Sequence, residues 1–289
     1  MWFRKKPTTT EGSDTPAPVN TGVERMHTWV RGGLERSLRP VRATRGSSWI
    51  VAGYIALLVA DQLTLAYVER FGLVFNIVVL FVLVAGALLS ENLRKLSVSL
   101  AILPVAYMAT SSFTTHNAFQ KAAVFYGLLL VLTLVYRYLF TLEDDVERSR
   151  LKLRGHAFGL PLMLIMGEVA GVVGYAFLRH QYPYGHISLP LVAIASIVFA
   201  ITEEMLLRGL VQKEAEKVVT PSAAVGLASV LYAALAFNSQ TLLSIGPAIV
   251  MGVVLALVYK FKQNLLLSIA INAAAKLTYI GLIATFVLR

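Results

Sequence analysis

The chain has 289 residues, of which 57% are hydrophobic and only 15% carry a charged side chain. A soluble domain carries about 25% charged residues, so this composition and the mean hydropathy of +0.68 exclude an ordinary soluble protein. The net charge of +10 does not indicate nucleic-acid binding, because most basic residues fall in the N-terminal arm and in loops, where they attract anionic lipid. The absence of cysteine excludes disulfides and thiolate metal sites.

The N-terminal arm, residues 1–47, precedes the first long apolar segment. Residues 1–20 are rich in Pro, Thr and Ser, and we expect them to be disordered. Residues 21–47 are basic with a thin apolar stripe. This pattern is typical either of an amphipathic helix lying among cytoplasmic headgroups or of a solvated basic arm, and Gly32 and Gly33 weigh against the helix.

Nine apolar segments follow, and a helix that crosses a bilayer needs about 20 such residues. They are Trp49–Val68, Phe71–Leu89, Leu96–Ser112, Ala122–Phe140, Leu160–Leu178, Leu189–Leu210, Ala223–Phe237, Leu242–Tyr259 and Leu265–Leu288. We therefore predict an all-α, polytopic membrane protein with about nine transmembrane helices.

The loops between these segments alternate in charge. One set holds most of the basic residues, including four between positions 148 and 154, whereas the other set holds only Arg70, Lys121 and Arg179. This alternation predicts an N-terminus inside the cell and a C-terminus outside. We expect the location to be the cytoplasmic membrane of a prokaryote.

The longest charged loop, Thr141–His156, divides the membrane part in two. We predict a four-helix half at residues 48–159 and a five-helix half at residues 160–289, with the arm at residues 1–47 as a third region.

Ionisable side chains within apolar segments are costly, so each is a functional hypothesis. Asp61 lies in the first segment, and Glu168 lies in the fifth between Gly167 and Gly171, a spacing typical of closely packed helices. We interpret Glu168 as a packing-face residue satisfied by a neighbour. The alternative is an ion or proton path, as in a small transporter.

The strongest candidate site lies at the end of the sixth segment, in the stretch Ile201–Gly209. Glu204 and Arg208 are four residues apart, so on a helix they share one face and can pair. Glu203 lies one step around the helix, where it can point into the interior of the bundle.

Residues from about 160 to 289 resemble the CAAX-protease and bacteriocin-processing family, the Abi-like intramembrane endopeptidases related to the type II CAAX prenyl endopeptidases. That family carries Glu-Glu-x-x-x-Arg, Phe-x-x-x-His and His-x-x-x-Asn on successive helices. Glu203, Glu204 and Arg208 match the first motif in full.

The other two motifs are altered. Tyr232 supplies the aromatic residue of the second motif, but Ala236 replaces its histidine. Asn272 and Lys276 stand at the histidine and asparagine positions of the third. None of the five histidines of the chain lies in the last four apolar segments.

The resemblance implies that the first glutamate and a histidine activate a water or bind a metal, while the last two residues polarise the scissile carbonyl. Ala236 can neither activate a water nor bind a metal. Asn272 can donate to an oxyanion but cannot bind zinc as an imidazole does. We expect no cofactor, and zinc follows from the resemblance alone. The position of Lys276 in the third motif predicts a buried ion pair with Glu203. The alternative is that Lys276 acts as a base.

Three functions stay open. The first is an intramembrane endopeptidase with a rearranged site, in which Glu203, Glu204, Arg208, Asn272 and Lys276 are the candidate catalytic residues. The second is a catalytically dead member that binds peptides or acts as a scaffold, and the third is a small proton-coupled transporter. The expected partners are membrane lipids and a membrane-associated peptide or prenylated protein.

Overall fold

The computed structural model describes residues 45–67, 69–111, 118–140, 159–178, 188–237 and 245–286, and every regular element in these ranges is helical. The long helices are α2 (Arg45–Tyr67), α3 (Glu69–Leu89), α4 (Glu91–Ser111), α5 (Ala118–Phe140), α7 (Gly159–Leu178), α8 (Leu189–Glu204), α10 (Pro221–Phe237), α11 (Ile245–Lys262) and α12 (Leu265–Phe286). Three features lie outside the described residues. They are the basic arm up to residue 44, the charged loop at 141–156 and all five histidines.

The described helices agree with the nine predicted apolar segments. Six are long and apolar enough to cross a membrane, and three shorter apolar helices cover Ser48–Thr64, Pro161–Ala176 and Pro221–Leu235. The polytopic helical membrane fold is therefore confirmed. The orientation of the chain and its division at residue 160 stay predictions.

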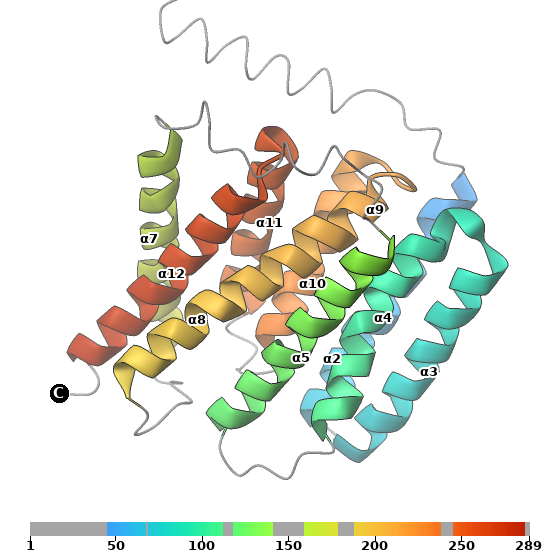
Figure 1. Ribbon diagram of the computed structural model, residues 1–289, viewed down its shortest axis with the longest axis horizontal. Coiled ribbons are helices and arrows are strands. Elements are labelled where there is room, and N and C mark those ends of the chain that lie inside the picture. Colours follow the sequence, from blue (N-terminus) through green and yellow to red (C-terminus); the bar gives the residue numbers. More distant parts are fainter. Residues whose placement is uncertain are drawn as a thin grey trace, which may run out of the picture. The chain divides into compact units, whose positions relative to one another are not determined.

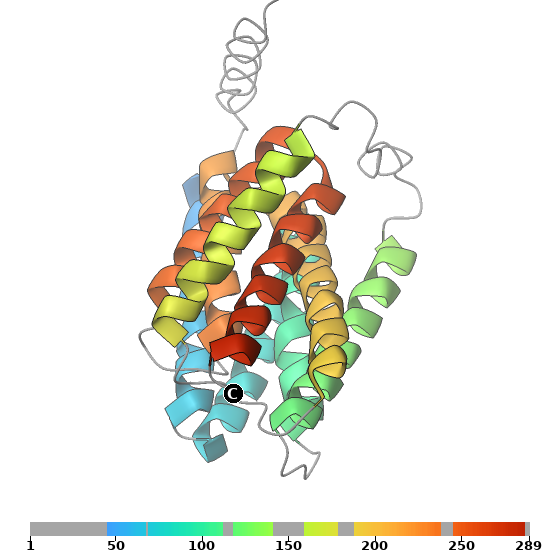
Figure 2. The same cartoon turned by 90° about the vertical axis from the view of Figure 1, so that its left-hand side faces the viewer.

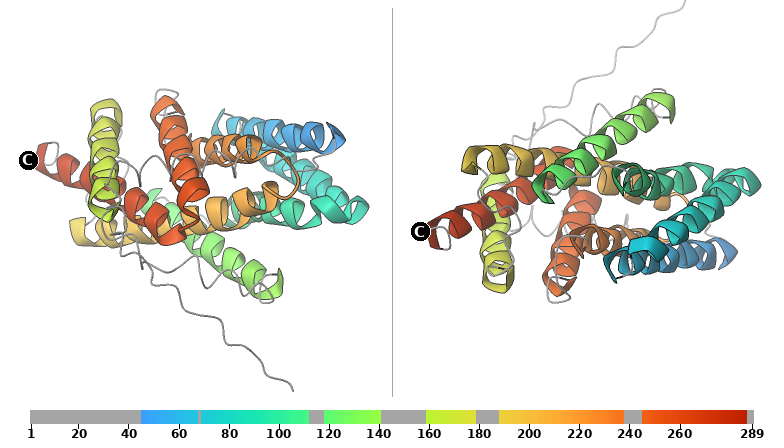
Figure 3. Two further views of the ribbon diagram at one scale, coloured as in Figure 1. Left: turned by 90° about the horizontal axis from the view of Figure 1, so that it is seen from above. Right: turned by 90° about the horizontal axis from the view of Figure 1, so that it is seen from below.

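The helices pack in two different patterns. Helices α2, α3, α4 and α5 pack in chain order, and α3 lies at one edge (Figure 1). In the C-terminal part, several spatial neighbours are distant in sequence, because α12 packs against α7 and α8, and α10 packs against α2 as well as against the next helix, α11. Helix α7 lies at the edge opposite α3 and crosses α12 (Figures 1 and 3). Figure 2 shows α7 and α12 packed side by side.

The chain around the acidic pair lies at the centre of this arrangement. After Glu204, α8 continues into a π-helical segment, η2 (Met205–Gln212), and the short α9 (Lys213–Ala215). η2 contacts α4, α5, α10, α11 and α12, and its Leu206, Leu207 and Leu210 are fully buried. π-helical turns are rare and occur mostly as local features at functional sites, so the position of this one beside the acidic pair is informative.

Two glycines let α7 approach α12 closely. A Cβ atom at Gly167 would lie 2.5 Å from the carbonyl oxygen of Ile271, and one at Gly171 would lie 2.5 Å from that of Ala275. Any larger side chain would force the helices apart. The packing role predicted for this glycine spacing is present.

The two isolated acids have opposite surroundings. Asp61 is fully buried, and Gln62 Nε2 lies 3.5 Å from its Oδ2. Glu168 is exposed, so the prediction that a neighbour satisfies it is wrong for the part of the chain that the structure describes. The reason is the rotation of α7, because Gly167 and Gly171 occupy its inner face.

Candidate functional site

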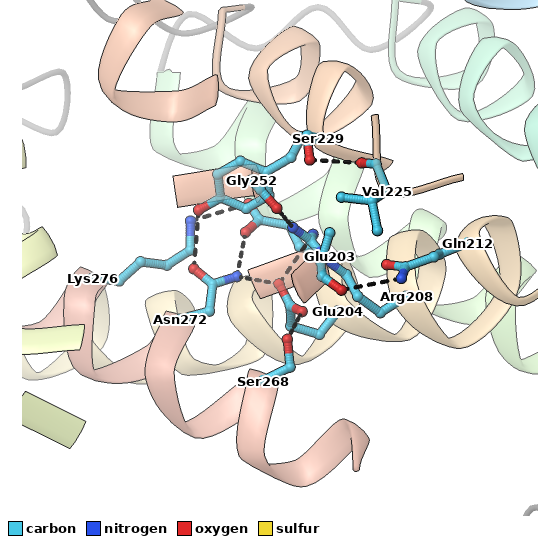
Figure 4. Close-up of polar contacts among 12 residues, drawn as sticks. Glu203, Glu204, Arg208, Gln212, Val225, Ser229, Gly252, Ser268, Asn272 and Lys276 are labelled. Atoms are coloured by element: carbon cyan, nitrogen blue, oxygen red, sulfur yellow. Dashed lines mark hydrogen bonds and ion pairs between the residues drawn. The ribbon is translucent and has the colours of Figure 1, made fainter. Parts of the chain in front are cut away.

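Helix α8 supplies the acidic pair, and α12 supplies three of the polar side chains that contact it (Figure 4). Glu203 and Glu204 are the last residues of α8. Ser268, Asn272 and Lys276 follow one another at intervals of four along α12, so they share one face of that helix. This face of α12 meets the end of α8, and all five side chains make contacts there.

A tight turn fixes the beginning of α12. Gln263 has a φ of 50°, in the left-handed region that ends helices, and its N–H donates to the carbonyl oxygen of Tyr259 at 2.7 Å. Asn264 Oδ1 then accepts a hydrogen bond of 3.3 Å from the N–H of Leu267, which caps the new helix. The turn thereby sets the rotation at which α12 faces the acidic pair.

Glu203 accepts three hydrogen bonds in a buried position. Its Oε1 accepts from the Tyr126 hydroxyl at 2.7 Å and from Lys276 Nζ at 3.0 Å. Its Oε2 accepts from Asn272 Nδ2 at 2.9 Å. The ion pair with Lys276 that the sequence predicts is therefore present.

Glu204 has its own set of partners and is fully buried. Its Oε1 lies 3.2 Å from Arg208 Nη1 and accepts a hydrogen bond of 3.0 Å from Asn272 Nδ2. Its Oε2 accepts a short hydrogen bond from the Ser268 hydroxyl. The pairing with Arg208 predicted from their spacing is present as well.

Asn272 joins the two carboxylates. Its amide group donates one hydrogen bond to Glu203 and one to Glu204, while its Oδ1 accepts from the Tyr232 hydroxyl at 3.1 Å. Both N–H donors of Asn272 are therefore already used within the cluster. In this arrangement neither donor is directed at an oxyanion.

Arg208 anchors the cluster to α10 and α11. Its Nη2 donates to the carbonyl oxygen of Gly252 at 3.0 Å, and its guanidinium lies 5.0 Å from the centre of the Tyr232 ring. Gly252 is required there, because a Cβ would lie 2.8 Å from the carbonyl oxygen of Ser229. Farther along, Gln212 Nε2 donates to the carbonyl oxygen of Ala256 at 3.1 Å.

The charges in this cluster balance. Glu203 and Glu204 face Lys276 and Arg208, one cation to each carboxylate. Buried charges are tolerated when they are paired and their remaining hydrogen-bonding capacity is used, and both carboxylates meet that condition. The arrangement is that of a neutral, internally bonded network.

Sequence reasoning missed several members of this network. Ser268 stands four residues before Asn272, so the same helical spacing that linked Asn272 to Lys276 would have found it. Tyr126 comes from α5 and is 77 residues away from Glu203, and no local pattern indicates such a contact. The side chain of Ala236 lies outside the described residues.

The donor set does not fit a zinc ion. In the described ranges, no group of three or more His, Cys, Asp or Glu side chains is placed to hold a metal. In addition, an ammonium group stands 3.0 Å from Glu203 Oε1, where a cation bound by this carboxylate would have to lie. Zinc sites use neutral imidazoles, thiolates and carboxylates, and an adjacent lysine opposes a second cation.

One protein-family match covers the segment that contains this site. Residues 185–278 match the family described as type II CAAX prenyl endopeptidase Rce1-like. This part of the chain is therefore similar to that family. The matched segment contains all five predicted site residues, and the match supports the resemblance drawn from the Glu-Glu-x-x-x-Arg motif. No curated protein and no solved structure matches the chain.

Proposed function

We propose that this chain is a non-hydrolysing membrane protein of the CAAX-peptidase family. The observation that carries the proposal is the contact of 3.0 Å between Lys276 Nζ and Glu203 Oε1. The carboxylate that resembles the family's water-activating acid is bound to a lysine instead. Its charge is neutralised by that pair, so it is a poor acceptor for a proton from water.

Other features of the same site support this proposal. A general base must lie within hydrogen-bonding distance of the water that it activates, and Glu203 already accepts from Tyr126, Asn272 and Lys276. An oxyanion needs free donors, and both N–H groups of Asn272 are engaged by carboxylates. Position 236 carries alanine, which can accept no proton.

The retained function in this proposal is binding. The family acts on prenylated C-terminal tails, so the partner we propose is a prenylated or otherwise membrane-associated peptide held without cleavage. About a quarter of the Lys276 side chain is exposed, at 27%, whereas Glu204 and Arg208 are fully buried. Lys276 is thus the member of the cluster that a bound peptide is able to reach.

The test uses the full chain in lipid nanodiscs with a farnesylated peptide that ends in a CAAX sequence. We expect the wild-type chain to bind this peptide more tightly than the unprenylated form and to release no tripeptide. Cleavage by the wild type that is lost in Glu203→Ala would overturn the proposal in favour of an active, rearranged site. Equal affinity for the prenylated and unprenylated peptides would overturn the binding part.

A gain-of-function series gives the converse test. Ala236→His, Asn272→His and Lys276→Asn together restore the residue types of the family's two altered motifs. We expect this triple variant to acquire cleavage that a further Glu203→Ala change removes. The variant with Lys276→Asn alone is the matched control, and we expect it to stay inactive because it still lacks an imidazole.

Metal content provides an independent measurement. We expect purified wild-type protein to contain no stoichiometric zinc, because Lys276 occupies the cation position beside Glu203. One equivalent of zinc that Glu203→Ala removes would contradict this expectation. Zinc that stays in Glu203→Ala would be bound elsewhere in the chain and would leave the assignment of the cluster unchanged.

A further inference from the structure

One face of helix α7 packs against the bundle, and the opposite face is exposed. Gly167 and Gly171 are buried against α12, which lies beside α7 at the edge of the bundle (Figure 2). The opposite face is exposed and apolar, and its large side chains are Leu162, Ile165, Val169, Val172 and Val173. An exposed apolar face on a membrane helix is ordinary, since lipid covers it.

Glu168 makes this face unusual. It is exposed, it lies between Ile165 and Val172 in helical order, and it is the only charged residue in α7. It is also the tenth of the 20 residues of α7. At 1.5 Å per residue this is roughly 15 Å from either end, which is the middle of a hydrocarbon layer about 30 Å thick.

A carboxylate at that depth is strongly disfavoured unless it has a partner. Intramembrane acids face a bundle interior, a water-filled cavity or an opposite charge, and the short glutamate side chain does not span half a bilayer. Among the described residues, no hydrogen bond or ion pair engages Glu168, in contrast to Glu203 and Glu204. The partner must therefore come from outside the described part of the chain.

The charge on this face also indicates which partner fits. A symmetric contact between two copies through α7 would bring together the same face twice, with Glu168 as its only charged group. Such a contact supplies no cation, and two carboxylates repel. A helix of a different protein with a Lys or Arg at mid-membrane depth supplies both the opposite charge and an apolar surface.

We propose that the exposed face of α7 is a docking surface for a single transmembrane helix of another protein, with a basic residue of that helix paired to Glu168. This surface is defined by Glu168 and the five exposed apolar residues of α7 named above. The glycines on the packed face hold α7 rigidly on α12, so the docking surface is presented from a fixed backbone. The inference is independent of whether the acidic cluster hydrolyses peptides.

The test uses model helices in lipid vesicles. Because the chain has no cysteine, one introduced at exposed Ser188 takes a single fluorophore. The probes are two synthetic transmembrane peptides of Leu and Ala, one with Lys at its central position and one with Leu there. Energy transfer measures the association of each peptide with the wild-type chain and with Glu168→Leu and Glu168→Gln.

We expect the Lys peptide to bind the wild type about 3- to 30-fold more tightly than it binds Glu168→Leu, the range that intramembrane polar contacts give. The Leu peptide should bind all three proteins equally. Glu168→Gln separates charge from hydrogen bonding, and we expect it to resemble Glu168→Leu. Since Glu168 is exposed, these variants should keep the helix content and elution volume of the wild type.

A variant with a displaced carboxylate tests the register. Glu168→Leu combined with Val172→Glu moves the acid by one helical turn, and we expect it to prefer a peptide with its Lys moved by one turn. Equal binding of the Lys peptide to the wild type and to Glu168→Leu would overturn the proposal. Energy transfer between two copies of the wild type that Glu168→Leu abolishes would also overturn it, because the occupant would then be a second copy.

Discussion

The ion pair between Lys276 and Glu203 predicts a specific pattern of stability. Lys276→Met removes the cation and leaves Glu203 buried with only the neutral donors Tyr126 and Asn272. At 3.0 Å, the gross attraction between unit charges is on the order of 5 kcal/mol with an effective dielectric constant of ~20. Because 27% of the Lys276 side chain is exposed, solvent screens part of this attraction.

We therefore expect Lys276→Met to lower the free energy of unfolding by about 2 kcal/mol, less than the 3–5 kcal/mol typical when a fully buried pair loses one partner. The double variant Lys276→Met with Glu203→Gln removes both charges. The double variant should lose about 1–2 kcal/mol less free energy of unfolding than Lys276→Met alone, because no uncompensated carboxylate remains.

The assay is reversible unfolding in mixed micelles by titration with sodium dodecyl sulfate, applied to the wild type, both single variants and the double variant. Arg94→Met is the matched control, because Arg94 pairs with Glu91 at 3.8 Å on an exposed surface, and its removal should leave the transition unchanged. If the effects of Lys276→Met and Glu203→Gln add, the two side chains are not coupled and the pairing is refuted.

Three further outcomes test the fold around the site. Gly167→Ala should destabilise the protein by about 1–3 kcal/mol in the same assay, because its Cβ would lie 2.5 Å from the Ile271 carbonyl oxygen. Gly174→Ala, whose Cβ would have its nearest neighbour at 3.9 Å, should be tolerated, and equal losses would contradict the close packing. Arg208→Met should cost about 3–5 kcal/mol, seen as loss of monodisperse protein after extraction, and adding Glu204→Leu should recover part of the yield. Reporter fusions should place the N-terminus inside and the C-terminus outside, and both ends on one side would contradict nine spans.

Much of the fold was readable from the sequence. Apolar segments near 20 residues in length predicted the helices. A helix that crosses a bilayer needs this length of apolar sequence whichever helices it packs against. The pairing of Glu204 with Arg208 was also readable, since their contact depends only on helical spacing. Gly167 and Gly171 indicated close packing for a similar local reason.

One prediction from the sequence depended on the motif pattern of the family as well as on helical spacing. The ion pair of Lys276 with Glu203 spans 73 residues, and it was predicted only because the motif order aligned α12 with α8. The match to residues 185–278 supports that alignment. The roles of the five site residues in catalysis stay a prediction until the cleavage and binding experiments are done.

The sequence by itself determined the helices, the acidic pair with its arginine, and the absence of the family's histidines. Only the tertiary structure decided that Tyr126 and Ser268 complete the network, that Asn272 joins both carboxylates, and that Glu168 points away from the bundle. The physical reason is that residue spacing fixes which side chains share a face of a helix. The direction in which that face points is set by helix rotation, which depends on packing against partners far away in the chain.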